Sequence, residues 1–262
     1  MGTDGAARAE DQGDAVLPRV IALQNCSNLR DLGGYHAADG RRLRMGRVFR
    51  GASLANLTDA DLVEFAALGI RTVCDLRGIK ESGRAPSRLP DDDAPEVLAL
   101  PIEPRVGASL RDLLARNATK GEDMYAVLQT AYSAYAGEHL PRYRRLFELL
   151  LEGGRLPLLF HCSAGKDRTG FGAALLLTAL GIPQKTVMAD YLATNRIWRR
   201  EHALPPDTPA ALRDTLLTAH QALLEHALKQ AVDCYGSLER LLAEGLGLDA
   251  ARLRRLRDTL LE

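Results

Sequence analysis

Hydrophobic and polar residues follow two different periods along this chain. Short segments rich in apolar residues predict strands at 47–51, 70–76, 97–102 and 156–160, of which 70–76 is typical of a buried strand. Apolar residues spaced three and four apart predict helices at 58–68, 169–180, 210–232 and 250–261, and a helical pattern over 109–152 that is interrupted near 117–121, at Gly137 and at Pro141. Strands that alternate with helices predict an α/β fold in which helices flank a central, mostly parallel sheet.

Punctuating residues indicate where these elements begin and end. Thr58 is a predicted helix N-cap and Gly69 a predicted helix stop. The segment 28–34 (NLRDLGG) predicts a tight loop, and the prolines and aspartates of 82–95 predict a longer loop. Residues 1–16 are polar and predict a disordered tail, and 17–262 predict a single domain.

Composition narrows the class of protein. Lys plus Arg and Asp plus Glu number 34 each, so the basic excess of a nucleic-acid binder is absent. The four cysteines form no CxxC pair, which favours a reducing compartment. No leader is visible, and the apolar run 173–182 is about half of the ~20 residues that span a bilayer. We expect a cytoplasmic protein with no stable membrane insertion. Export by a route that needs no leader stays open, and the sequence does not assign an oligomeric state.

The most informative segment is HCSAGKDRTG, residues 161–170, in which five residues separate Cys162 from Arg168. It joins a predicted strand to a predicted helix, where backbone N–H groups and the helix dipole favour a bound anion and a thiolate. Cys162 is the predicted nucleophile, and the fork of Arg168 can hold two phosphate oxygens. The predicted phosphate-binding residues between and after them are Ser163, Ala164, Gly165, Lys166 and Thr169.

Two other interpretations of this segment fit less well. A buried structural cysteine does not account for three charges and two glycines directly after an apolar strand. A Walker A loop requires Ser or Thr after the lysine, but Asp167 follows Lys166, and Phe160 stands where the first glycine belongs.

The segment resembles the Cys-x5-Arg loop of protein tyrosine phosphatases. Its GKDRTG portion is similar to the atypical bacterial tyrosine/lipid phosphatase family, the group related to the mycobacterial secreted tyrosine phosphatase B. The segments 28–34 and 75–81 resemble that group's NxRDLGG and DLRxxxE signatures, so the resemblance spans roughly 20–260. It implies one phosphatase domain with no metal and no cofactor. It also implies activity on phosphotyrosine, with phosphoserine, phosphothreonine or phosphoinositides as further substrates.

The general acid is not assigned by the resemblance, because Ile79 stands where the family's usual acid is expected. Asp167 is the first choice, since similar lipid phosphatases place an aspartate directly before the loop arginine. The alternative is that Asp167 only shapes the loop and that Asp75, Glu81 or one residue of the run 91–93 donates the proton.

Several further residues have open roles. Lys166 faces either the phosphate or a second anionic group, or is a surface lysine. Thr169 contacts the thiolate or caps the helix. Supporting roles are expected for His161, Asp75, Arg30 and Asp31. His161 has no second His or Cys at ligand spacing, so no metal site is predicted.

Three functions remain in competition. The first is a phosphotyrosine or dual-specificity protein phosphatase, and the second is a phosphoinositide phosphatase with the same phosphocysteine chemistry. The third is a phosphate-binding pseudoenzyme, against which the intact Cys162 and Arg168 argue. The segment of about 105–137 either forms a helical lid over the loop or packs permanently on the sheet.

Overall fold

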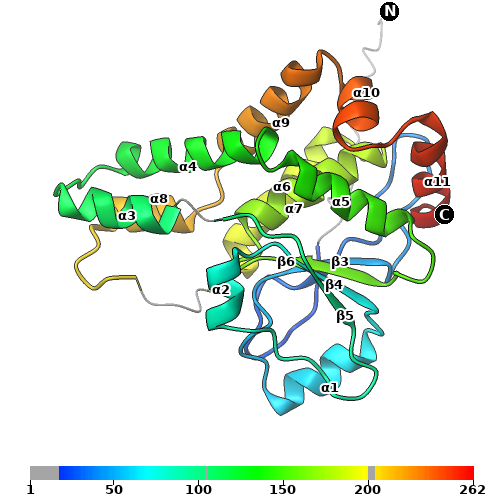
Figure 1. The fold of residues 1–262 in the computed structure, drawn as a ribbon, viewed down its shortest axis with the longest axis horizontal. Coiled ribbons are helices and arrows are strands. Elements are labelled where there is room, and N and C mark those ends of the chain that lie inside the picture. The colour runs from blue at the N-terminus through cyan, green and yellow to red at the C-terminus, as the bar shows by residue number, and fades with distance from the viewer. Residues whose placement is uncertain (1–17, 104–105, 200–203) are drawn as a thin grey trace, which may run out of the picture.

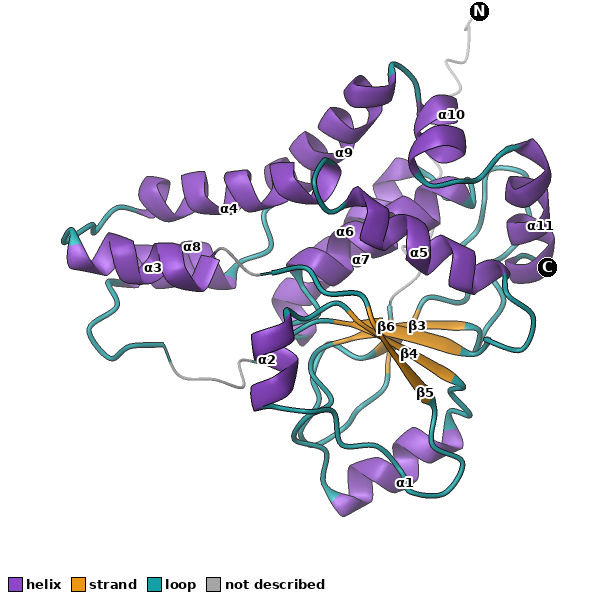
Figure 2. Ribbon diagram, viewed as in Figure 1, coloured by secondary structure: helices purple, strands orange, loops and turns teal. Residues whose placement is uncertain are grey.

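The structure is a computed structural model that describes residues 18–103, 106–199 and 204–262 (Figure 1). The predicted tail at 1–16 lies outside the described residues. The predicted α/β fold is confirmed: one central sheet has helices on both faces (Figure 2).

The sheet has the strand order β1-β2-β3-β6-β4-β5, and its four strands β3, β6, β4 and β5 are parallel. Their bounds are β3 (Val48–Gly51), β6 (Leu158–His161), β4 (Thr72–Asp75) and β5 (Glu96–Ala99). Two short antiparallel strands, β1 (Arg19–Val20) and β2 (Arg30–Asp31), extend the sheet beside β3. The expectation of a plain tight loop at 28–34 is therefore wrong at its centre, where β2 pairs with β3.

Side chains of the parallel strands alternate between the two faces of the sheet. Phe49, Val73 and Leu159 belong to the smaller apolar cluster, which also contains Phe65 of α1 (Asp59–Ala67). The apolar residues next to them in the chain face the other way and belong to the larger cluster, which includes the helices of the opposite face. These residues are Val48, Cys74, Leu158 and Phe160. Both faces are covered, which explains why these strands are continuous apolar runs instead of alternating ones.

The larger face carries most of the helices (Figure 1). Their bounds are α3 (Val106–Ala115), α4 (Gly121–Ala136), α5 (Leu140–Leu151), α6 (Asp167–Ala179), α7 (Gln184–Ile197), α8 (Ala210–Leu217), α9 (Gln221–Tyr235), α10 (Leu238–Arg240), a π-turn (Leu241–Gly245) and α11 (Ala250–Leu260). α6 and α7 lie beside each other over the sheet, and α3, α4 and α8 project together beyond it.

Two predicted element bounds are wrong for tertiary reasons. The expected loop at 82–95 begins later, because α2 (Ile79–Arg84) forms a short helix whose Glu81 accepts the N–H of Gly78. The single helix expected at 210–232 is broken between α8 and α9. At the break the amide of Asn195 bonds both backbone groups of Ala219, at 2.7 and 3.0 Å.

The proposed lid can be compared with the packing of α4. Its apolar stripe is buried in the larger cluster, with Tyr132 fully buried and Leu128 nearly so. This packing favours the alternative of a permanent element for α4, and a mobile lid over 105–137 stays a prediction. Within the described residues no helix is both long and apolar enough to cross a membrane.

Candidate active site

The segment predicted to bind phosphate connects β6 to α6 at the carboxyl end of the parallel strands. Cys162 follows β6 directly, and its thiol lines a pocket of about 220 Å³ together with Arg168 and Asp167 of the first turn of α6. Gly165 has a left-handed φ of 63°, and a Cβ there would lie 2.4 Å from the carbonyl oxygen of Gly51. Only glycine therefore fits where the loop crosses the end of β3.

Arg168 is held on one side by a carboxylate from α2. Its Nη1 lies 2.6 Å and its Nη2 3.1 Å from the carboxylate of Glu81, and Nη1 also donates to the carbonyl of Ile102. Nη2 also donates to the hydroxyl of Ser163 at 3.3 Å, which leaves Nε as the nitrogen of Arg168 without a partner among the described residues. The hydroxyl of Ser163 donates to Glu81 at 2.7 Å, which ties the loop to the same carboxylate.

Glu81 is a poor proton donor in this arrangement. Burial works to raise its pKa, but hydrogen bonds from Arg168 and Ser163 hold the pKa below the usual value for a glutamate. The predicted alternative role of Glu81 as general acid is therefore disfavoured by the structure, which gives it contacts suited to orienting Arg168.

Lys166 is buried, and backbone carbonyls already occupy its ammonium. Its ammonium donates to the carbonyl oxygens of Leu216 at 2.5 Å and Thr218 at 3.0 Å, at the carboxyl end of α8. Its Nζ lies 3.5 Å from Asp167. Cations suit helix carboxyl ends, so Lys166 fastens α8 to the loop.

Asp167 is the carboxylate in the pocket that no arginine neutralises. Its Oδ1 accepts a hydrogen bond of 2.9 Å from the hydroxyl of Tyr132 on α4, and that hydroxyl lies 2.6 Å from the hydroxyl of Tyr191 on α7. The side chain of Asp167 is 24% exposed, which leaves it in contact with the pocket. Two tyrosines from two helices thus fix its orientation.

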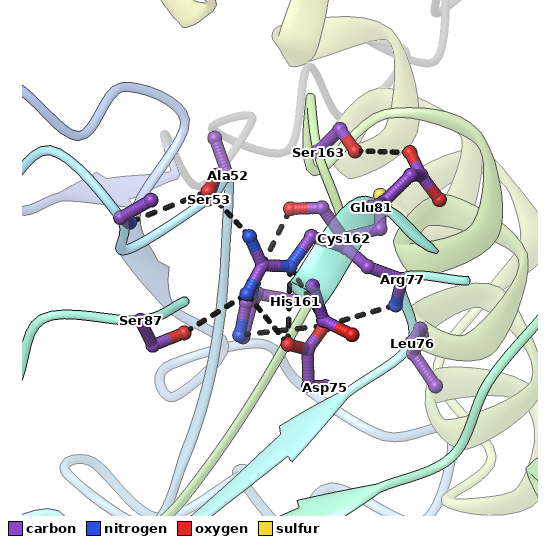
Figure 3. Close-up of polar contacts among 12 residues, drawn as sticks. Ala52, Ser53, Asp75, Leu76, Arg77, Glu81, Ser87, His161, Cys162 and Ser163 are labelled. Carbon is purple, nitrogen blue, oxygen red and sulfur yellow. Dashed lines mark hydrogen bonds and ion pairs between the residues drawn. The ribbon is translucent and has the colours of Figure 1, made fainter. Parts of the chain in front are cut away.

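His161 and Asp75 lie beneath the loop (Figure 3). Asp75 pairs with Arg77 at 2.7 Å, and Arg77 also bonds Ser53 and Ser87. Burial opposes ionisation of Asp75, but the hydrogen bonds from Arg77 hold its pKa below the usual range. Asp75 therefore stays ionised and is not a member of the pocket, which disfavours it as the acid.

The ring of His161 is completely buried. Its Nδ1 lies 3.2 Å from the carbonyl oxygen of Cys162, and its Nε2 lies 3.8 Å from Asp75. Burial lowers the pKa of His161, which leaves the ring neutral at pH 7. Its contacts are those of a residue that fixes the backbone of the nucleophile.

Of the remaining predicted residues, Thr169 adjoins the loop, and Arg30 and Asp31 lie outside it. The side chain of Thr169 is buried, and its hydroxyl has no partner among the described residues. Arg30 lies behind the loop, whereas Asp31 accepts the backbone N–H groups of Gly33 and Gly46 and does not contact the loop.

The acidic run 91–93 lies elsewhere. Asp92 and Asp93 line a separate pocket with Arg71, at the amino end of β4, whereas Cys162 lies at the carboxyl end of the parallel sheet. This placement disfavours the run as the source of the proton. Ile79 begins α2 and is 69% exposed.

Sequence reasoning missed several residues of the site. The pocket walls opposite the loop are apolar and come from distant segments, namely Trp198, Leu204, Leu216 and Leu217. The sequence also does not predict the hydroxyls of Tyr132 and Tyr191 that orient Asp167. No local pattern marks these residues, because their roles depend on which helices meet at the loop. In the described part of the chain no three His, Cys, Asp or Glu side chains are grouped to hold a metal ion.

Comparison with known proteins identifies the family. Residues 21–262 match the family described as "Tyrosine phosphatase family". A protein of Cupriavidus necator described as a "Putative tyrosine-protein phosphatase" is 34% identical over 245 residues, covering 89% of this chain and 86% of its own. The triple specificity protein phosphatase PtpB of Mycobacterium tuberculosis is 33% identical over 280 residues, covering 92% of this chain and 99% of its own. The crystal structure of TpbA from P. aeruginosa matches only weakly, with a TM-score of 0.31 and 15% identity over 76% of this chain and 96% of its own.

The chain belongs to the tyrosine phosphatase family. It is a cysteine-dependent protein tyrosine phosphatase, a phosphoric monoester hydrolase, as the loop motif and the resemblance to bacterial phosphatases indicated.

Proposed function

We propose that the enzyme hydrolyses phosphotyrosine in two displacements through a phosphocysteine at Cys162. The observation that carries the proposal is that Cys162, Arg168 and Asp167 all line one pocket. These are the nucleophile, anion-binding group and acid that the reaction needs.

In the first displacement the thiolate of Cys162 attacks phosphorus, and the bond between phosphorus and the phenolic oxygen breaks. Arg168 and the loop N–H groups stabilise the charge on the equatorial oxygens. Protonated Asp167 donates its proton to the departing phenolate, which leaves as neutral tyrosine.

In the second displacement water attacks the phosphorus of the phosphocysteine. The carboxylate of Asp167 takes a proton from that water, the phosphorus–sulfur bond breaks, and the thiolate is regenerated as inorganic phosphate leaves. Asp167 thereby ends the cycle protonated, as it began. Thr169 adjoins the loop, and its hydroxyl has no partner in the described part of the chain, which supports a role for it in stabilising the thiolate as leaving group.

The shape of the pocket supports phosphotyrosine over a phosphoinositide. Trp198, Leu216 and Leu217 give it apolar walls, which suit an aromatic ring. The ammonium of Lys166 is already bonded to two carbonyls and lies near Asp167, so a second phosphate group finds no free lysine there. A phosphoinositide phosphatase remains the second candidate. Turnover of a phosphotyrosine peptide against mono- and polyphosphorylated inositides separates the two, and faster hydrolysis of the inositides would refute our choice.

The role of Asp167 is tested by comparing leaving groups. Asp167→Asn should slow hydrolysis of phosphotyrosine by about 10²- to 10³-fold. It should slow a substrate with a strongly acidic phenol far less, because that phenolate departs without a proton. The basic limb of the pH–rate profile should flatten for phosphotyrosine, provided that chemistry limits the rate.

Tyr132→Phe is the matched variant, since it removes only the hydroxyl that orients Asp167. We expect the same selective pattern with a smaller loss. Equal losses for both kinds of leaving group in Asp167→Asn would show that Asp167 only shapes the loop.

A further inference from the structure

A buried carboxylate lies behind the loop, on the side away from the pocket. Asp190 of α7 is 1% exposed and pairs with Arg30 at 2.8 Å and with Arg50 at 2.7 Å. The hydroxyl of Tyr35 donates to it at 3.1 Å. The side chains of both arginines are completely buried, so this cluster is part of the interior and is not a substrate site.

The cluster reaches two successive carbonyl groups of the loop. Arg50 donates through Nη2 to the carbonyl oxygen of Gly165 at 2.7 Å. Arg30 donates to the side-chain and backbone oxygens of Asn28, and the amide nitrogen of Asn28 donates to the carbonyl oxygen of Ala164 at 2.9 Å. Both carbonyls are therefore bound, directly or through Asn28, to an arginine that Asp190 holds.

Holding these carbonyls also fixes the direction of the adjoining N–H groups. In a trans peptide the C=O and the N–H point in opposite directions. With the carbonyls of Ala164 and Gly165 drawn toward the buried cluster, the N–H groups of Gly165 and Lys166 point away from it. Neither N–H has an acceptor among the described residues. Convergent free N–H groups of this kind form the concavity that binds anions.

The cluster also carries a charge that favours an anion in front of it. Two guanidinium groups face one carboxylate, which leaves one positive charge in excess behind the loop. Burial lowers the pKa of Arg50 to about 10, so it remains charged at neutral pH. A charge in a buried position is screened weakly by solvent.

Close packing of α6 on α7 keeps the cluster in place. A Cβ at Gly170 would lie 2.9 Å from the ring of Tyr191 and 3.4 Å from Nη2 of Arg50. Asn28 has a φ of 60°, a conformation that Asn tolerates better than most residues. The identities of Asn28, Arg30 and Gly170 thus have one physical explanation.

We infer that Asp190 is a positioning residue of the enzyme: through Arg50, and through Arg30 and Asn28, it orients the loop N–H groups toward the phosphate. The inference rests on the phosphate-binding role proposed above for the loop. Asp190 touches no reacting atom, so its removal acts on phosphate binding through the loop geometry.

The test compares Asp190→Asn and Asn28→Gly with the wild type, well below the melting temperature of each variant. Asn28→Gly deletes the amide but keeps a residue that accepts the left-handed φ, so it decides the question if Asp190→Asn does not fold. We expect a loss of about 10- to 100-fold in kcat/KM for an aryl phosphate, from misplacement of the loop. Inhibition by inorganic phosphate should weaken as well. Alkylation of Cys162 by iodoacetamide should reach half its maximal rate at a higher pH.

The matched control is Asp61→Asn. Asp61 is 2% exposed and accepts backbone N–H groups of Gln24 and Thr58, with no contact to the loop. It should lose thermal stability and keep the wild-type phosphate inhibition and alkylation profile.

The inference is overturned if the folded Asp190→Asn and Asn28→Gly variants keep phosphate inhibition and alkylation within about twofold of the wild type, since the expected losses are larger. Failure of the proposed function gives a different result. In that case phosphate does not inhibit the wild type, or a variant without Cys162 still turns over substrate, and the inference fails together with the proposed function.

Discussion

Cys162→Ser should abolish turnover of phosphotyrosine, with a loss on the order of 10⁴-fold or more, because a serine hydroxyl is not ionised at working pH. The substitution keeps the size of the side chain and leaves the loop N–H groups and Arg168 in place. The variant should therefore still bind inorganic phosphate and phosphotyrosine peptides. Steady-state turnover and equilibrium binding of the peptide measure the two effects separately.

The control for this variant is Cys234→Ser, which removes an exposed thiol remote from the pocket. It should leave both turnover and binding unchanged. Turnover by Cys162→Ser above a few per cent of the wild type would mean that another group attacks phosphorus.

Arg168→Lys should lower kcat/KM by about 10³-fold although the charge is kept, since a fork that stabilises the transition state is lost. A lysine ammonium can pair with Glu81 in place of the guanidinium, but it has no equivalent of the Nε–H to offer the phosphate. Both weaker phosphate inhibition and a lower kcat are expected. Steady-state kinetics with an aryl phosphate, together with thermal unfolding, tests this.

Arg84→Lys at the exposed end of α2 is the corresponding control, because it makes the same exchange outside the pocket. It should behave as the wild type. A loss below about tenfold in Arg168→Lys would show that charge alone, without the fork, carries the effect.

The sequence predicts the parts of the site that are contiguous in the chain. Cys162, Arg168 and the glycines between and after them lie in one strand–loop–helix segment, and its local geometry follows from residue type. The inner strands β4 and β6 are predictable for the same reason, since a strand buried on both faces is rich in apolar residues. The N-cap at Thr58 was predicted correctly because capping depends on a few adjacent residues.

The parts that were missed depend on contacts between distant segments. The break after α8 follows from Asn195 and Lys166, neither of which lies near it in the chain. The ion pair of Glu81 with Arg168 gives α2 a partner outside its own segment. The sequence alone predicts that a loop already begins at residue 82, within this helix. The link from Asp190 to Gly165 passes through a residue of β3, and no pattern in α7 marks it.

The most direct test of the central claim is rapid acid quenching during turnover of phosphotyrosine, followed by peptide mapping of the enzyme. Wild type and Asp167→Asn are compared, since the variant should break down the intermediate slowly. We expect phosphate on the peptide that carries Cys162, attached to the sulfur of that residue. The same peptide of Cys162→Ser should carry no phosphate. Phosphate on a different residue, or steady turnover by both enzymes with no phosphorylated peptide, would contradict the account.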